Sequence, residues 1–280
     1  MITFREETFE PPFLDDIRQL TESIKGRFVE AKNVGHADLA GLWQGMTIDL
    51  LFAISWRYMI PRAVFQKARL GAYVIHDSLL PQYRGFAPTV WAVVNGESQT
   101  GATLFEIADG VDEGRIIGQQ SVPVGPDETI RNVMDRVTEA YLQLIKTHLP
   151  SLIDGTAGRT VQDESVATYT CKRTPEDNQI NWDSRSDVIL NLIRGVTRPY
   201  SGAYTFLNGN RLVIWSASRI EKAPRYVGRV PGRVVEIRPG HGTVVLTRDG
   251  CIILQSVQAD NSPEACAADI VNRLSMTLGR

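Results

Sequence analysis

The chain has 280 residues, 43% of them hydrophobic and 22% charged, which is the composition of an ordinary globular protein with one or two domains. Its 30 basic and 32 acidic residues leave a formal net charge of −2, so the overall charge does not indicate nucleic acid or an anionic membrane as a partner. No apolar run reaches the roughly 20 residues that cross a bilayer, and the N-terminus lacks a signal-peptide pattern, so a cytoplasmic location without membrane contact is the default expectation.

Cysteine and histidine are too scattered to predict a metal site or a disulfide framework. Cys171, Cys251 and Cys266 are far apart in the sequence and are expected to be reduced and structural. His36 and His241 lie beside glycines without a companion at metal-ligand spacing, so surface or turn positions are expected for both.

The first part of the chain predicts a helix followed by two strands. Apolar side chains recur at helical spacing over residues 12–25, a short strand is expected near 27–29, and the apolar run at 48–55 is typical of a parallel strand covered on both faces. The aromatic and basic residues at 55–61 have two interpretations. They either pack around a turn, or they form one wall of a pocket for a flat ring, because aromatic and thioether side chains pack well on such rings.

Residues 71–119 predict two strands with a polar loop after each. The first strand, 72–75, leads into His76 and a loop rich in turn formers; a helix is expected at 89–94, and a second strand precedes the acidic, glycine-bracketed loop at 109–114. Open α/β sheets bind ligands outside the carboxyl ends of their strands. We therefore expect His76 and Asp112 to meet there.

A long amphipathic helix is expected to begin near residue 126, and the sequence pattern changes after it. Small and polar residues at 154–170 predict a linker, and a helix is expected at 186–196. Asn-Gly, Pro-Gly and Asp-Gly turn signals then separate β-rich runs, which predicts a small β-barrel, and a Ser-Pro-Glu sequence at 262–264 predicts the start of a last helix.

Several of these motifs together resemble the folate-dependent formyltransferase family, which includes methionyl-tRNA formyltransferase and the formyltransferases of amino-sugar nucleotides. The sequence HDSLLP at 76–81, YRG at 83–85, Asn95-Gly96, Thr100-Gly101 and the loop at 109–114 carry the resemblance. KRTPED at 172–177 with Asn181-Trp182 resembles the start of the family's C-terminal domain. Motifs in a fixed order over most of the chain are far more specific than one short signature.

The resemblance implies a fold of two domains. It implies a Rossmann-like α/β formyltransferase domain with a mostly parallel sheet over residues 1–160, and a small OB-like β-barrel over residues 170–280. Residues 1–4 correspond to the family's second strand, so the first strand and helix, about 30 residues, are expected to be missing from this sequence. Either the sequence starts inside a longer natural chain, or this member lacks those elements.

The resemblance also implies a site. The family's catalytic set is an Asn, a His two residues later, and an Asp in the acidic loop; His76 and Asp112 match the last two, with His76 as general base or proton relay and Asp112 as the group that orients the imidazole or holds a water. The implied formyl donor is 10-formyltetrahydrofolate, and no metal is expected. The implied donor-binding residues are Trp56, Met59, Ile60, Asp109, Gly110 and Val111.

Val74 is the one departure, since it occupies the position of the family's Asn and cannot donate a hydrogen bond. Losing one oxyanion donor typically costs about 10² to 10³ in turnover, or about 3 to 4 kcal/mol, which slows an enzyme without abolishing it. A backbone amide, an ordered water or another polar side chain such as Ser78 is an alternative donor.

Three functions are therefore considered. The first, and the one expected, is formyl transfer to a small-molecule amine on a sugar nucleotide, amino acid or peptide intermediate. The second is formylation of initiator methionyl-tRNA, which requires a basic surface. Residues 5–12 are acidic where the tRNA enzymes carry an arginine and lysine-rich insertion, which argues against tRNA as a partner. The third is a non-catalytic homologue or one with an altered one-carbon transfer, and Val74 is its main support.

Overall fold

The computed structural model describes residues 1–6, 12–31 and 47–280 in two compact units. The first unit comprises Met1–Thr89, Gln99–Pro123 and Met134–Lys172, and the second comprises Val90–Ser98, Val124–Val133 and Arg173–Arg280. His36, and residues 7–11 of the acidic stretch after the first strand, lie outside the described residues. No helix in the described part of the chain is long and apolar enough to cross a membrane.

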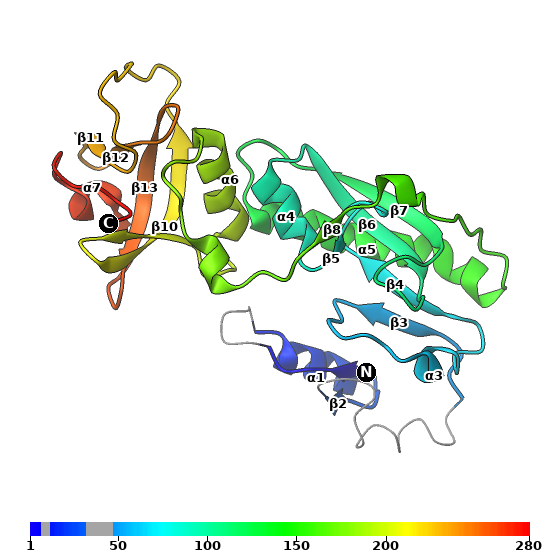
Figure 1. Cartoon of the computed structure of the whole chain (residues 1–280). Coiled ribbons are helices and arrows are strands. Elements are labelled where there is room, and N and C mark those ends of the chain that lie inside the picture. The colour runs from blue at the N-terminus through cyan, green and yellow to red at the C-terminus, as the bar shows by residue number, and fades with distance from the viewer. Residues whose placement is uncertain (7–11, 32–46) are drawn as a thin grey trace. The chain divides into compact units, whose positions relative to one another are not determined.

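The first unit is built on a four-stranded sheet in the order β3-β4-β6-β7 (Figure 1). Its strands are β3 (Leu51–Ile54), β4 (Ala72–His76), β6 (Gln99–Glu106) and β7 (Ile116–Pro123). β3 runs parallel to β4, but β6 is antiparallel to both β4 and β7. The predicted mostly parallel sheet is therefore wrong for this sheet. A run such as β6, buried along nearly its whole length, indicates a central strand but carries no information about direction.

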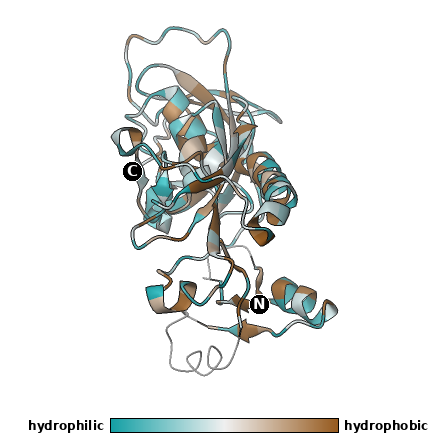
Figure 2. Ribbon diagram, turned by 90° about the vertical axis from the view of Figure 1, so that its right-hand side faces the viewer, coloured by the Kyte–Doolittle hydropathy of each residue, from teal (hydrophilic) through white to brown (hydrophobic). Residues whose placement is uncertain are grey.

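The core of this unit lies around the two central strands and the long helix α5 (Ile130–Ile153). The helix α4 (Pro88–Asn95) connects β4 to β6 along the chain. Hydrophilic and hydrophobic residues alternate along the helical ribbons in Figure 2, as the 3.6-residue period of amphipathic helices requires. Fully buried side chains of this unit include Tyr73, Ile75, Leu104 and Phe105 from the sheet and Leu152 from α5.

The N-terminal segment forms a small parallel pair beside two helices. β1 (Ile2–Thr3) pairs with β2 (Val29–Glu30), and α1 (Leu14–Ser23) lies within the helix predicted at 12–25. The short helix α3 (Arg62–Phe65) follows β3. Its buried Val64 packs against partly buried hydrophobic side chains: Ile2, Val29, Ala31, Leu51, Trp56 and Ile60.

The segment expected to be an irregular linker contains regular structure. β8 (Tyr169–Thr170) pairs in parallel with β5 (Arg84–Gly85), which belongs to the loop after β4. The 3₁₀ turn Glu164–Val166 precedes β8, and residue 160 bridges to Ile116 at the start of β7. The chain between the long helix and the second unit is therefore hydrogen-bonded to the loop that follows His76.

The second unit contains the predicted helix, α6 (Ser186–Val196), and a six-stranded antiparallel sheet. The sheet order is β11 (Val234–Arg238), β12 (Gly242–Leu246), β13 (Cys251–Ala259), β10 (Asn210–Arg219) and β9 (Ala203–Leu207), with β14 (Ala265–Cys266) paired to β13. The β-rich prediction is confirmed, but the end strands β11 and β9 do not pair in the described chain, so the predicted barrel is not closed.

The last helix begins later than predicted. α7 spans Ala267–Ile270, after β14, so the Ser-Pro-Glu sequence at 262–264 does not start it. The Glu264 carboxylate instead contacts Arg198 and the Ser256 hydroxyl, which ties this stretch to the sheet. A sequence signal for a helix start is thus overridden by tertiary contacts.

Candidate active site

His76 ends β4 with its imidazole ring almost fully buried, its side chain being 8% exposed. Its Nε2 lies 2.8 Å from the backbone carbonyl oxygen of Tyr83. A carbonyl only accepts hydrogen bonds, so this contact assigns the proton of the neutral ring to Nε2 and leaves the lone pair on Nδ1. Nδ1 in turn faces Asp112, 3.6 Å from its Oδ2.

Asp112 is held in place by the backbone on the other side of the site. Its Oδ2 accepts a 2.8 Å hydrogen bond from the Gly85 amide, and its backbone is in the left-handed region with φ 53°. The 3.6 Å between Oδ2 and Nδ1 is longer than a hydrogen bond but within ion-pair range. A carboxylate thus faces the ring nitrogen that is able to accept a proton.

The two residues meet as predicted, although not by the predicted route. Because β6 is antiparallel to β4, the acidic loop begins beside the start of β4, where the Ile107 amide donates to the Ala72 carbonyl at 2.9 Å. The argument from the carboxyl ends of neighbouring strands is wrong for this loop. The loop connects β6 to β7 along the chain, and its course places the Asp112 carboxylate 3.6 Å from His76 Nδ1.

Hydrogen bonds fix the polar loop that follows His76. The Ser78 hydroxyl donates to the Gln82 carbonyl at 2.7 Å, and the Thr103 hydroxyl donates to the Ser78 carbonyl at 2.7 Å. Gln119 donates from Nε2 to the Leu80 carbonyl at 2.8 Å. Because the Ser78 hydroxyl proton is already engaged, this side chain does not serve as the alternative oxyanion donor.

Asp77 is bound by two hydroxyl groups of the first unit. The Thr89 hydroxyl donates to its Oδ2 at 2.7 Å. Burial, followed by the charge of Asp77 and a hydrogen bond to it, raises the pKa of Tyr141 well above its ordinary value. Tyr141 therefore keeps its proton and anchors the carboxylate next to His76 to the long helix α5.

Val74 is half-buried in β4, where its backbone pairs with Ala53 of β3 and Phe105 of β6. Residues two apart on a strand face the same side, so position 74 shares the face of His76. The strand thus presents an aliphatic group beside the histidine.

The predicted donor-binding residues lie on two segments of the first unit joined by an ion pair. Arg62, two residues after Ile60, donates to Asp109 Oδ2 at 2.8 Å. Met59 is 58% exposed and Val111 45% exposed, so each segment offers an apolar side chain to solvent.

The other predicted donor-binding residues are engaged within the protein. Trp56 and Ile60 pack against Val64, and the Trp56 ring contacts Phe4 and Tyr58 at centroid distances of 5.4 and 5.7 Å. The Gly110 amide donates to Glu113 Oε1 at 2.8 Å. Both interpretations of residues 55–61 therefore have support, with Trp56 and Ile60 in packing and Met59 open to a ligand.

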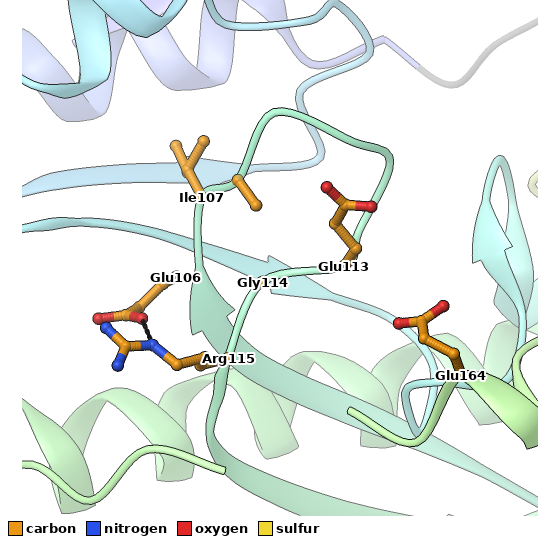
Figure 3. A pocket seen from close by; sticks show the side chains of 7 residues that line it. Glu106, Ile107, Glu113, Gly114, Arg115 and Glu164 are labelled. Carbon is orange, nitrogen blue, oxygen red and sulfur yellow. Dashed lines mark hydrogen bonds and ion pairs between the residues drawn. The ribbon is translucent and has the colours of Figure 1, made fainter. Parts of the chain in front are cut away.

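A hollow of about 510 Å³ lies where the acidic loop begins and ends (Figure 3). Its volume is in the range of small-molecule sites. Neither His76 nor Asp112 lines it. Glu106 is paired there with Arg115 at 2.6 Å and with Arg159 at 2.7 Å. The sequence did not predict this hollow, because its charged residues are not spaced in a pattern typical of a binding site. The lining residues are Glu106, Ile107, Ala108, Glu113, Gly114, Arg115 and Glu164.

Within the described residues, no three His, Cys, Asp or Glu side chains are grouped so as to hold a metal ion.

Comparison with known families shows which family the chain belongs to. A family model described as formyl transferase matches residues 5–149, and a second, described as the formyl transferase C-terminal domain, matches residues 172–275. The chain belongs to the formyl transferase family. The resemblance inferred from the motifs is thereby confirmed.

Solved structures share the fold of this formyl transferase. HypX from Aquifex aeolicus in complex with tetrahydrofolic acid is 20% identical with a TM-score of 0.66, covering 97% of this chain and 46% of its own. WlaRD, a sugar 3N-formyl transferase, is 17% identical with a TM-score of 0.59, covering 94% of this chain and 98% of its own. Methionyl-tRNA formyltransferase from Clostridium thermocellum is 19% identical with a TM-score of 0.55, covering 78% of this chain and 92% of its own. The chain thus spans about half the length of HypX, and identities this low establish the fold alone.

Proposed function

We propose that this formyl transferase moves a formyl group from 10-formyltetrahydrofolate to the amine of a small-molecule acceptor. The observation that carries the proposal is the pairing of His76 with Asp112, 3.6 Å apart, inside the region that matches the family. Folate as donor is supported by HypX, which was solved with tetrahydrofolic acid, and by WlaRD, which was solved with dTDP and 5-N-formyl-THF.

The chemistry assigned to the chain is proton transfer from the attacking amine. The amine attacks the formyl carbon of the donor and loses a proton as the new C–N bond forms. The bond between that carbon and N10 of the donor then breaks, and N10 takes up a proton and leaves as tetrahydrofolate. Nδ1 of His76 accepts the proton of the amine, because the Tyr83 carbonyl keeps the other nitrogen protonated. Asp112, held by the Gly85 amide, faces Nδ1 and balances the charge that the proton brings.

Donor binding is assigned to the two segments joined by Arg62 and Asp109. The exposed Met59 and Val111 side chains suit the faces of a pterin, since thioether and aliphatic groups pack against flat rings. The Gly110 amide donates to Glu113 Oε1 at 2.8 Å, so a pterin that reads this amide has to displace the Glu113 carboxylate. Trp56 and Ile60 pack on Val64 and thereby hold the segment that carries Met59 in place.

A small-molecule acceptor is favoured over tRNA by charge. The chain carries a formal net charge of −2, and the sequence at 5–12 contains three glutamates against one arginine. A tRNA acceptor requires many basic contacts to phosphates. Because WlaRD is a sugar 3N-formyl transferase and was solved with dTDP, an amino-sugar nucleotide is the first acceptor to test, followed by amino acids and peptide intermediates.

Val74 supports a second candidate, a homologue that binds folate without transfer or that performs an altered one-carbon transfer. The Ser78 hydroxyl donates to the Gln82 carbonyl, so this side chain does not replace the family's Asn.

The deciding experiment incubates the purified protein with 10-formyltetrahydrofolate and a panel of amines, and follows the release of tetrahydrofolate. His76→Ala should abolish the release. His241→Ala is the matched control, because His241 is an exposed turn residue of the second unit and its loss should leave the rate unchanged. Absence of release with every amine, from a folded protein that binds a folate analogue, would favour the second candidate.

A further inference from the structure

The backbone groups on the two sides of Arg84 hold both members of the His76–Asp112 pair. The Tyr83 carbonyl accepts from His76 Nε2 at 2.8 Å, and the Gly85 amide donates to Asp112 Oδ2 at 2.8 Å. Arg84, between them, points its side chain the other way, and that side chain is fully buried at 0% exposure. The position of β5 therefore sets the distance between the imidazole and the carboxylate.

Gln162 connects the buried arginine to the loop that carries Asp112. Its Oε1 accepts hydrogen bonds from Arg84 Nη2 at 2.8 Å and Nε at 3.2 Å. Its Nε2 donates to the backbone carbonyls of Asp112 and Gly114, each at 2.8 Å. The amide thus uses both donors and both acceptor positions, which leaves it a single orientation.

The frame around Gln162 is fixed on both sides. Residue 160 exchanges two 2.8 Å backbone hydrogen bonds with Ile116, and the Arg84 amide donates to the Thr168 carbonyl at 2.9 Å. Glu164 binds Arg84 through both carboxylate oxygens, at 2.7 and 2.9 Å. Glu164 and Gly114, the last residue of the acidic loop, both line the hollow shown in Figure 3. Gln162 is therefore anchored where it can restrain that loop.

The backbone of Asp112 needs such a restraint. Its φ of 53° lies in the left-handed region, which costs a non-glycine residue free energy and persists only when surrounding contacts hold it. Gln162 binds the carbonyl of Asp112 itself and the carbonyl two residues later. The amide therefore fixes the peptide geometry that aims the carboxylate at His76.

We propose that Gln162 is a positioning residue for the carboxylate of Asp112 in formyl transfer, acting through the two loop carbonyls that its amide binds. The role rests on the proposed function, in which Asp112 faces the proton-accepting nitrogen of His76. Gln162 does not touch the reacting groups, and its contribution is the placement of the acidic loop.

The test is Gln162→Glu, which keeps the side-chain shape and the acceptors for Arg84 but replaces the NH₂ group that binds the two carbonyls. The turnover number should fall by about 10- to 100-fold, since a displacement of about 1 Å can cost 10² in rate. The KM for the acceptor should be unchanged, because the lost interaction orients the reacting groups and does not bind the acceptor.

A second measurement does not depend on activity. The Gly85 amide proton, which donates to a carboxylate, should resonate downfield in NMR spectra. Asp112→Asn, whose side-chain oxygen still accepts but carries no charge, gives the reference for loss of the carboxylate. Gln162→Glu should move this resonance toward the Asp112→Asn position. If the wild-type protein proves to transfer no formyl group, this resonance still decides the positioning role, so the two proposals fail separately.

Gln258→Glu is the matched control. Gln258 also bridges two partners, accepting from Trp215 Nε1 at 2.9 Å and donating to the Ser262 carbonyl at 2.9 Å, but it belongs to the second unit. It should leave both the turnover number and the Gly85 resonance unchanged. A wild-type turnover number or an unmoved resonance in Gln162→Glu would overturn the proposal.

Gln162→Met provides a second variant if the glutamate variant does not fold. Methionine has a similar length and removes all four hydrogen bonds, and the same two measurements apply. Loss of the fold in both variants, judged by thermal unfolding, would also overturn the proposal, because Gln162 would then be required by the fold itself.

Discussion

Restoring an amide at position 74 is the most direct test of the catalytic assignment. Val74→Asn places a hydrogen-bond donor on the strand face that His76 shares, two residues earlier in β4. If the protein is a slow formyl transferase, the added donor should raise the transfer rate by up to about 10² to 10³. At 1.36 kcal/mol for each tenfold change, this corresponds to about 2.7 to 4 kcal/mol of transition-state stabilisation.

The same substitution should lower stability. Val74 is half-buried between Ala53 and Phe105 in the sheet, and an amide without a partner in such a place costs about 1 to 3 kcal/mol. Val213→Asn is the matched control, since Val213 is a half-buried strand valine in the second unit. It should bring a comparable stability cost and no gain in rate.

The assay follows tetrahydrofolate release from the formyl donor with each amine, in Val74→Asn alone and combined with His76→Ala. The combined variant should be inactive, because an asparagine does not accept the proton of the amine at neutral pH. A Val74→Asn protein that is folded and binds the folate analogue, yet transfers no formyl group, would refute the assignment of this strand face to catalysis.

Three further predictions concern binding and pH. Calorimetry should show weaker binding of a stable formyl-folate analogue to Trp56→Ala, and unchanged affinity would place the donor elsewhere. Initiator tRNA should show no submicromolar, strongly salt-dependent association with the protein; such binding would contradict the small-molecule acceptor. The hydrogen bond from Arg84 lowers the pKa of Glu164 below its ordinary 4.5, so their ion pair stabilises the fold above that pH and is lost as the pH falls through the lowered value. In Glu164→Gln the free energy of unfolding should therefore fall less steeply as the pH is lowered through this range. An unaltered pH dependence would contradict the contribution of this pair.

Local patterns predicted which segments are regular and which are buried. The helices around residues 14–23 and 186–196 and the strand leading to His76 follow from apolar periodicity, because that periodicity is a direct consequence of burying one face. The direction of β6 does not follow, since a strand covered on both faces has the same apolar sequence whichever way it runs.

The sequence predicted the residues that carry the chemistry of the candidate site better than the residues that hold them in position. His76 and Asp112 carry motif and loop signals that a single sequence displays. Gln162 lies in a stretch of small and polar residues that resembles a linker, and its importance arises only from the partners that the fold brings to it. Trp56 and Ile60 show the converse, because side chains suited to a ligand ring are equally suited to packing on Val64.

The pairing of β5 with β8 has a consequence for how the chain can be divided. A shortened protein ending near residue 160 would contain His76 and Asp112 but would lack Gln162 and the backbone partners at Thr168 and Thr170. Amide hydrogens at 84–86 should then exchange rapidly, and in the intact chain they should open together with those at 168–170 as one cooperative unit. The segment at 160–170 is in this sense part of the candidate site, and the smallest autonomous piece of the chain that keeps the site would have to include it.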